Sequence, residues 1–306
     1  GIFGVLVFQY ILARFYFRRF IRGYQRLSAK GKKIWGSIGV IGTRFISAII
    51  GLVLLVIVLL SNEIFVGIGV AVISIMALYE LLTALGYIKQ KPLIFACFGG
   101  SIILIILSYL QREIVLMVLY IYIMALFIII LKYHKIIVFG DISAVFFASV
   151  YICFLLSHIT FTRMLPNGKI LVWLIFIGAW MTDTCAFFAG TFFGRHKLFP
   201  EVSPKKTIEG SLGGIIGCVL SFILFGFMVE KMYLYSVNYA NLSVLGLLCS
   251  IMGQLGDLSA SVIKRKYGIK DFGNIMPGHG GIMDRFDSVI FVAPLVYYYL
   301  IFFKVI

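Results

Sequence analysis

Long apolar runs separated by short polar stretches account for most of this chain. Nine runs can be read, at residues 45–61, 64–88, 93–111, 113–131, 137–161, 170–193, 210–229, 242–263 and 288–305. Each is close to the ~20 apolar residues that a helix needs to cross a bilayer. The runs do not alternate with period two, which argues against a membrane barrel. The expected fold is all-α, a polytopic transmembrane helical bundle of about nine spans.

The composition supports the membrane assignment. Of 306 residues, 62% are hydrophobic and 13% are charged, whereas a soluble domain has about 25% charged residues. Too little polar surface remains to cover a water-facing globule, which excludes soluble and disordered classes. The five cysteines form no C-x-x-C pair and lie in apolar runs, so they indicate small buried residues and not disulfides or a zinc site.

The net charge of +15 reflects where the basic residues lie. Of 27 Lys and Arg residues, 22 precede the first run or lie in the loops after runs 2, 4, 6 and 8. The positive-inside rule therefore places the N-terminus and these loops in the cytoplasm. Much of the excess of basic residues therefore marks the cytoplasmic side of the membrane, and no nucleic-acid partner is expected. The expected location is the cytoplasmic (inner) membrane, crossed many times.

Residues 1–37 form a separate segment in this scheme, and residues 38–306 form the nine-span domain. An apolar stretch is followed by eight basic residues between Arg14 and Lys33. This pattern is typical of an interfacial helix on anionic lipid. A chain that begins at Gly1 and carries Trp35-Gly-Ser is equally consistent with a fusion segment, so no function is based on these residues.

Six carboxylates fall within the predicted spans or at their cytoplasmic ends. They are Glu80, Asp141, Asp183, Asp257, Asp284 and Asp287. An ionisable group at the bilayer centre costs about 2.5 to 3.5 kcal/mol on insertion scales, so such groups normally face a polar interior. Their positions predict a polar cavity open to the cytoplasm. For Glu80 and Asp141 we favour a simpler interpretation, in which each pairs with a Lys or Arg between helices.

The loop before the last run carries the densest set of chemically useful residues. These are Lys264, Arg265, Lys270, His279, Gly280, Gly281, Asp284, Arg285 and Asp287. Glycines let backbone N–H groups approach an anion, and Lys and Arg neutralise phosphate oxygens. If the last helix begins one turn early, Asp284 and Asp287 share a face and, with Asp257, suit Mg²⁺. The alternative is a solvated loop whose acids pair with its own basic residues.

The loop after the sixth run contains a second candidate site. Ser203 followed by Pro204 is typical of a helix N-cap with proline in the first turn. Lys205 and Lys206 would then lie at the positive end of a helix dipole, where positive charge is unfavourable. A bound anion would offset this cost. We therefore predict a phosphate site at this helix start. An ordinary basic loop facing anionic lipid is the alternative.

Together these motifs resemble the phosphatidate cytidylyltransferase (CDP-diacylglycerol synthase) family. Residues 261–287 are similar to the family's long signature, Ser203-Pro-Lys-Lys-Thr-Ile-Glu-Gly-Ser to a second motif, and Asp183-Thr-Cys-Ala-Phe-Phe-Ala-Gly to the helix before it. The long signature is specific because its Lys-Arg, Lys-Asp, His-Gly-Gly and Asp-Arg-x-Asp elements coincide at fixed spacing. The resemblance covers about residues 40–306.

The resemblance implies a nucleotidyltransferase of phospholipid biosynthesis, which transfers a cytidylyl group from CTP to phosphatidic acid and yields CDP-diacylglycerol and pyrophosphate. The implied catalytic residues are Asp257, Asp284, Asp287, Lys264, Arg265, Lys270 and His279. The implied substrate-binding residues are Ser203, Lys205, Lys206, Thr207, Arg285, Gly280 and Gly281. Mg²⁺ would be held by Asp257, Asp284 and Asp287, with Asp183 as a further candidate ligand and K⁺ as a candidate second cation. A homodimer in membrane lipid, with the active site facing the cytoplasm, is also implied.

Two other interpretations remain open. One is a different CTP- or CDP-lipid-dependent membrane transferase or kinase; an alcohol phosphatidyltransferase would require a longer series of spaced aspartates than Asp284-x-x-Asp287. The other is an ion-coupled transporter, which is less favoured because no internal repeat is apparent. His279 suits phosphate binding better than general base catalysis, since a phosphate dianion needs little activation.

Overall fold

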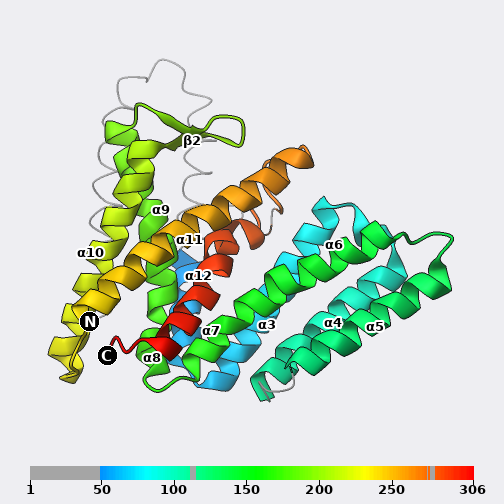
Figure 1. Ribbon diagram of the computed structural model, residues 1–306, viewed down its shortest axis with the longest axis horizontal. Coiled ribbons are helices and arrows are strands. Elements are labelled where there is room, and N and C mark those ends of the chain that lie inside the picture. Colours follow the sequence, from blue (N-terminus) through cyan, green and yellow to red (C-terminus); the bar gives the residue numbers. More distant parts are fainter. Residues whose placement is uncertain (1–48, 111–114, 274, 276–279) are drawn as a thin grey trace.

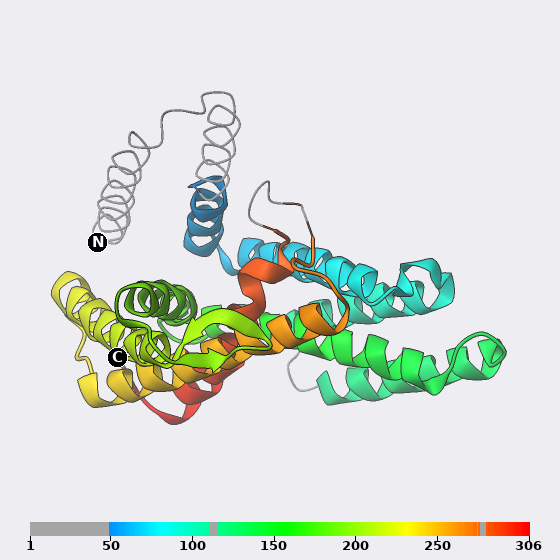
Figure 2. The same ribbon diagram turned by 90° about the horizontal axis from the view of Figure 1, so that it is seen from above.

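The structure is a computed structural model that describes residues 49–110, 115–273, 275 and 280–306 (Figure 1). The predictions for residues 1–37 and for the cytoplasmic N-terminus lie outside these residues. In Figure 2, α9 to α12 form one group of helices, and α4 and α5 extend away from it. Helices α3 and α7 join the two groups, because both pack against α12 on one side and against α4 on the other.

The described chain is almost entirely helical. Its helices are Ile49–Leu60, α3 (Glu63–Ala84), η1 (Tyr87–Lys89), α4 (Lys91–Leu110), α5 (Val115–Tyr133), α6 (Phe139–Ser149), the π-helical turn η3 (Val150–Phe154), α7 (Leu155–Arg163), α8 (Gly168–Leu171), α9 (Trp173–Phe193), α10 (Ile208–Tyr233), α11 (Tyr239–Lys266) and α12 (Met283–Phe302). The all-α bundle is confirmed.

The number of spans is close to the prediction. Seven helical segments of the described chain are long and apolar enough to cross a membrane, with α6 to α7 and α8 to α9 each counted as one. Two shorter apolar helices, Ile49–Leu60 and Lys91–Ile103, coincide with the first and third predicted spans. Helix α12 begins one turn earlier than the last apolar run, because its first turn is polar.

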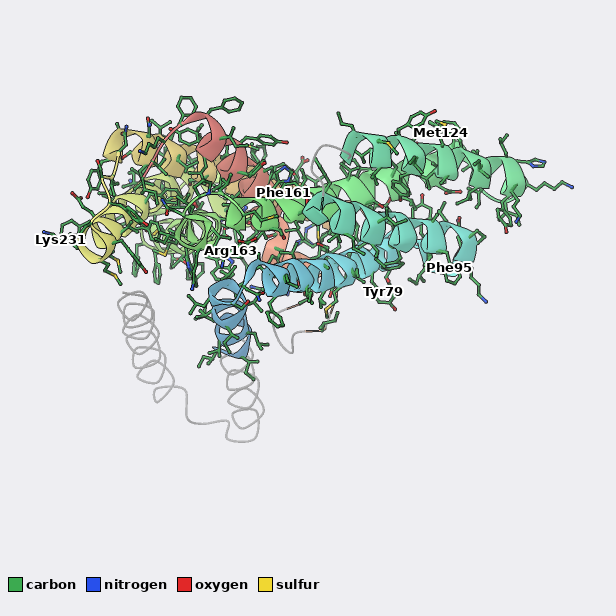
Figure 3. All side chains as sticks on the ribbon, turned by 90° about the horizontal axis from the view of Figure 1, so that it is seen from below. Tyr79, Phe95, Met124, Phe161, Arg163 and Lys231 are labelled. Carbon is green, nitrogen blue, oxygen red and sulfur yellow. The ribbon has the colours of Figure 1, made fainter. Side chains whose placement is uncertain are left out.

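The outer surface of the bundle is apolar. Tyr79 on α3, Phe95 on α4 and Met124 on α5 point outwards in Figure 3, and 76% of the surface of Phe95 is exposed. Large exposed hydrophobic side chains are unfavourable in water and favourable against lipid chains. The side chains that face inwards form a continuous core between the helices.

Helices α9 and α10 pack closely because small residues line their interface. A Cβ atom at Gly213 would lie 2.2 Å from the Cβ atom of Ala189, and one at Gly217 would lie 2.3 Å from the Sγ atom of Cys185. Small residues let helix backbones approach in a membrane, where van der Waals contact drives helix association. This packing sets the distance between the two helices that flank the second motif.

A β-hairpin joins α9 to α10 where the sequence predicted a helix start. Strand β1 (Lys197–Phe199) pairs with β2 (Ser203–Thr207) in antiparallel orientation, and Ser203 lies opposite Phe199. The N-cap of α10 is Thr207, whose Oγ1 accepts a hydrogen bond from Gly210 N at 3.1 Å. The prediction of a helix starting at Ser203 is therefore wrong. Ser203 and Thr207 are both suitable N-cap residues, and the helix begins after Thr207, which places the acidic Glu209 in its first turn.

Replacing Thr207 by Ala is expected to lower the free energy of unfolding by about 1 kcal/mol, because the N-cap hydrogen bond to Gly210 N is lost. Unfolding in mixed detergent micelles measures this change. Thr191→Ala is the matched control, since Thr191 Oγ1 donates a hydrogen bond to Phe187 O within α9 and its side chain is exposed. Equal stability of the two variants would contradict the capping role.

Candidate active site

Three carboxylates from different helices lie in the same region of the bundle. Asp183 lies on α9, Asp257 on α11 and Asp287 on α12, and each interacts electrostatically with the other two. The Ser288 hydroxyl donates a hydrogen bond to Asp183 Oδ2 at 3.3 Å. The three residues, which we call the acid cluster, come from three separate parts of the sequence and are brought together because α9, α11 and α12 pack against each other.

A glycine on α11 allows the acid cluster to form. A Cβ atom at Gly256 would lie 2.5 Å from the backbone oxygen of Asp287, a separation that no side chain can adopt. Glycine at this position therefore lets α11 and α12 approach until their backbones almost touch. The neighbouring residue, Asp257, is thereby brought beside Asp287.

The members of the acid cluster differ in exposure. Asp287 is 7% exposed and Asp257 is partly buried, whereas Asp183 is exposed at the midpoint of α9. An exposed carboxylate in the middle of a spanning helix requires water around it. The polar cavity around these acids stays a prediction.

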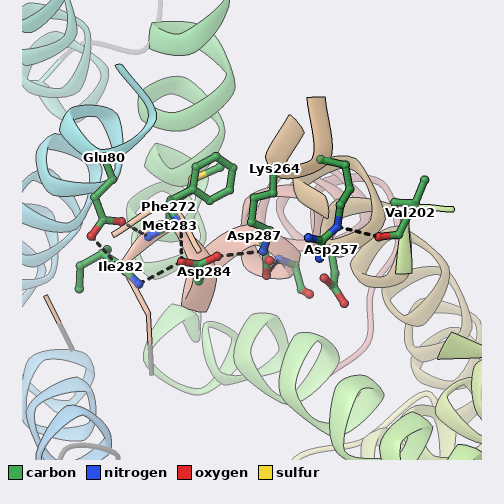
Figure 4. A network of polar contacts seen from close by, with 12 residues as sticks. Glu80, Val202, Asp257, Lys264, Phe272, Ile282, Met283, Asp284 and Asp287 are labelled. Carbon is green, nitrogen blue, oxygen red and sulfur yellow. Dashed lines mark hydrogen bonds and ion pairs between the residues drawn. The ribbon is translucent and has the colours of Figure 1, made fainter. Parts of the chain in front are cut away.

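Asp284 is held separately from the acid cluster, one helical turn before Asp287. Its Oδ1 atom lies 2.8 Å from Lys264 Nζ, and its Oδ2 atom accepts hydrogen bonds from Phe272 N at 2.8 Å and Gly281 N at 3.0 Å (Figure 4). Lys264 Nζ also lies 5.4 Å from the centre of the Phe272 ring. Asp284 and Asp287 are both on α12, as predicted, but Asp284 joins the two ends of the preceding loop.

The basic residues lie around these acids. Lys206 on β2 forms an ion pair with Asp257, with Nζ to Oδ2 at 2.5 Å. Arg265 Nε donates to Val202 O at 3.3 Å, which attaches the hairpin to the end of α11. Lys205, Lys270 and Arg285 are exposed. The second motif therefore contributes its lysines from a strand and not from a helix start, so the predicted contribution of the helix dipole is wrong.

The glycine-rich turn is described only in part. Gly280 has a φ of 83°, a left-handed conformation that favours glycine. Gly281 is buried and its N–H group donates to Asp284 Oδ2, so this N–H is already used within the protein. His279 lies outside the described residues, and its proposed role in phosphate binding has no structural account.

The prediction that Glu80 and Asp141 each pair with a Lys or Arg is wrong. Glu80 accepts hydrogen bonds from Ile282 N and Met283 N at the start of α12, and Asp141 Oδ2 accepts from Val138 N at 3.0 Å, which caps α6. No Lys or Arg forms an ion pair with either carboxylate in the part of the chain that the structure describes. Backbone N–H groups at helix starts lack intrahelical partners, so they stabilise a carboxylate without a side-chain cation.

Two polar contacts that sequence analysis did not predict fix α10. Gln254 on α11 accepts from Ser211 Oγ at 2.5 Å and donates to Ser211 O at 3.2 Å. Glu209 accepts from the backbone N–H groups of Arg195 and His196 and pairs with His196 Nδ1 at 2.6 Å. Both contacts join residues of ordinary polar type far apart in sequence, so no local signal pointed to them.

The acid cluster has the donor type that Mg²⁺ prefers, since carboxylate oxygens with substrate phosphates are its usual ligands. Among the described residues, no three His, Cys, Asp or Glu side chains are arranged closely enough to share a metal ion. A shared ion would therefore require the carboxylates of the acid cluster to converge further. Lys206, Lys264 and Arg285 offset part of the repulsion between these carboxylates.

Comparisons with known proteins identify similar sequences. A model described as "Cytidylyltransferase family" matches residues 42–303. A Bacillus subtilis (strain 168) protein named phosphatidate cytidylyltransferase is 38% identical over 167 residues, which cover 54% of this chain and 61% of that protein. Proteins of the same name from Staphylococcus haemolyticus and Staphylococcus aureus (strain COL) are 48% and 46% identical to this chain, respectively, over 121 residues. In both cases the matched residues cover 40% of this chain and 45% of the relative. The chain thus spans about half the length of the curated relatives it matches.

Proposed function

The chain belongs to the cytidylyltransferase family, and from this membership we propose that it transfers a cytidylyl group from CTP to phosphatidic acid, giving CDP-diacylglycerol and pyrophosphate. The names of its curated relatives support this reaction. The observation that carries the proposal is the acid cluster, because it lies beside phosphate-binding residue types inside a membrane bundle. A reaction between a soluble nucleotide and a lipid phosphate needs both features.

The two substrates approach from different directions in this proposal. CTP reaches the site from the side of the hairpin, where Lys205, Lys270 and Arg285 are exposed. Phosphatidic acid keeps its acyl chains in the bilayer and presents its phosphate between helices. The positive-inside rule supports placing this side in the cytoplasm, with the protein in the inner membrane. A homodimer is proposed from the family resemblance alone.

The proposed chemical step is an in-line displacement at phosphorus. An oxygen of the phosphatidic acid phosphate attacks the α-phosphorus of CTP, a new P–O bond forms, and the bond to the β-phosphate oxygen breaks as pyrophosphate leaves. Lys206 and Lys264, already paired with Asp257 and Asp284, neutralise the phosphate oxygens that gather there. Catalysis of this kind consists mostly of positioning and charge stabilisation.

Residues of the site also suit a metal cofactor. Asp257 and Asp287, with Asp183 and Asp284 as further ligands, would hold Mg²⁺, and K⁺ is proposed as a second cation. The metal would supply charge neutralisation of the triphosphate and of the leaving pyrophosphate. Arg265, Lys270 and Arg285 would bind phosphates beyond the reach of the ion, and Ser203 and Thr207 would position the hairpin that carries Lys205 and Lys206.

The test is a reaction of the purified full chain in lipid vesicles containing phosphatidic acid, with CTP labelled at its α-phosphorus and with Mg²⁺. We expect the label in CDP-diacylglycerol, pyrophosphate in equal amount, and no product without Mg²⁺. Vesicles containing diacylglycerol in place of phosphatidic acid are the control. Release of CDP with phosphorylation of diacylglycerol would establish the kinase alternative, and absence of any lipid product would reject the proposal.

A further inference from the structure

Glu80 is a buried acid that the proposed reaction does not use directly. It lies on α3 and is 2% exposed, yet its carboxylate reaches the start of α12, which is 202 residues away along the chain. Oε1 accepts from Ile282 N at 3.1 Å and Oε2 accepts from Met283 N at 2.9 Å (Figure 4). Both oxygens therefore bind the first backbone N–H groups of the helix that carries Asp284 and Asp287.

This location explains how a carboxylate is tolerated inside the bundle. The first N–H groups of a helix have no intrahelical partners and carry partial positive charge. Hydrogen bonds from N–H groups to an ionised carboxylate are stronger than those between neutral groups. Glu80 thus supplies α12 with a cap from another helix, since the N-cap residue, Ile282, has no side-chain acceptor.

The same carboxylate also holds both ends of the loop before α12. A Cβ atom at Gly273 would lie 2.3 Å from Glu80 Oε1, and one at Gly281 would lie 2.2 Å from Glu80 Oε2. Only glycine permits these approaches, so the backbone on either side of the glycine-rich turn packs directly on Glu80. Next to it, Asp284 Oδ2 accepts from Phe272 N and Gly281 N, which joins the same two loop ends.

We infer that Glu80 is a positioning residue, whose carboxylate fixes the backbone at Gly273 and Gly281 and the first turn of α12 and thereby the place of Asp284 and Asp287. Glu80 acts through these residues and contacts neither substrate. Its effect on catalysis rests on the proposed function, whereas its effect on the loop does not. A polar residue that orients metal ligands from outside the site typically changes metal affinity or activity by about 10- to 100-fold.

Glu80→Gln tests this inference, because Gln has the same shape but can accept only one of the two N–H bonds. Hydrogen exchange of the full chain in detergent, followed in the peptide that spans residues 280–286, is expected to be at least about tenfold faster in the variant, because a hydrogen bond to a charged acceptor is lost and local opening becomes easier. The Mg²⁺ concentration that gives half-maximal activity is expected to rise by a similar factor. Gly281→Ala perturbs the same contact from the other side, and we expect the same two changes.

Tyr122→Phe is the matched control, since it removes a buried hydrogen bond to Ser149 Oγ at 2.9 Å between α5 and α6, away from the loop. It is expected to leave both the exchange of residues 280–286 and the Mg²⁺ dependence unchanged. Equal exchange and equal Mg²⁺ dependence in wild type and Glu80→Gln would overturn the inference, as would a loss of activity with unaltered Mg²⁺ dependence. An inactive wild type would instead reject the proposed function, and the exchange measurement would still decide the role of Glu80 in the loop.

Discussion

Replacing Asp287 by Asn is expected to lower the rate of CDP-diacylglycerol formation by at least about 100-fold, the upper range seen for residues that only orient a metal ligand. Asp287 is the most buried member of the acid cluster and faces both Asp257 and Asp183. Asn keeps the volume of the side chain and removes its charge, so packing between α11 and α12 is retained. The measurement is the initial rate in phosphatidic acid vesicles at saturating CTP over a series of Mg²⁺ concentrations.

Asp141→Asn provides the comparison for this variant. Asp141 Oδ2 accepts from Val138 N at the start of α6, and the amide oxygen of Asn can accept the same hydrogen bond, so the activity of this variant is expected to stay within about twofold of wild type. Full activity of Asp287→Asn would show that the metal assignment is wrong while the reaction itself stands. Full activity restored at high Mg²⁺ would instead show that Asp287 contributes to affinity for the ion.

Replacing Lys264 by Met is expected to lower the free energy of unfolding by about 3 to 5 kcal/mol, because it leaves the Asp284 carboxylate buried without its cation. The Lys264 and Asp284 side chains are 11% and 4% exposed, and their charged atoms lie 2.8 Å apart. Met has a similar length, so little packing is lost. Unfolding in mixed detergent micelles measures the change without reference to any activity.

The double variant Lys264→Met with Asp284→Asn is expected to recover most of this stability, since neither partner is then an unpaired charge. Lys266→Met is the control on the same helix: Lys266 is exposed, and its loss is expected to cost less than about 0.5 kcal/mol. A Lys264→Met protein as stable as the control would contradict the buried ion pair.

The helices were predictable from sequence because the bilayer imposes a length and an apolar composition on each span. The residues between α9 and α10 and those at the start of α12 could be selected from the sequence as candidates, since their types and spacing suit phosphates and a cation. Their arrangement was less so: Lys205 and Lys206 lie on a strand because the helix cap is Thr207 and not Ser203. Both positions satisfy the same local rule, and only tertiary packing selects one.

Glu80 shows a second limit of prediction from the sequence. A single acid in an apolar run predicts a polar partner but not its identity, and a Lys or Arg is the usual expectation. The actual partners are backbone N–H groups, which every residue carries and which no sequence pattern marks. Gly273 and Gly281, which admit the carboxylate, were recognisable only as members of a glycine-rich turn.

The exposure of Asp183 at the midpoint of α9 has a consequence for the bilayer that the protein spans. Ten residues of helix, or about 15 Å, separate this carboxylate from either end of α9, so water that reaches it has entered half of the insulating layer. The other half of α9 carries Leu174, Ile175 and Phe176, which are at most 3% exposed and pack in the apolar core. These side chains then form part of the barrier that keeps ions from following the water, and polar substitutions there are expected to increase ion leakage from vesicles that contain the protein.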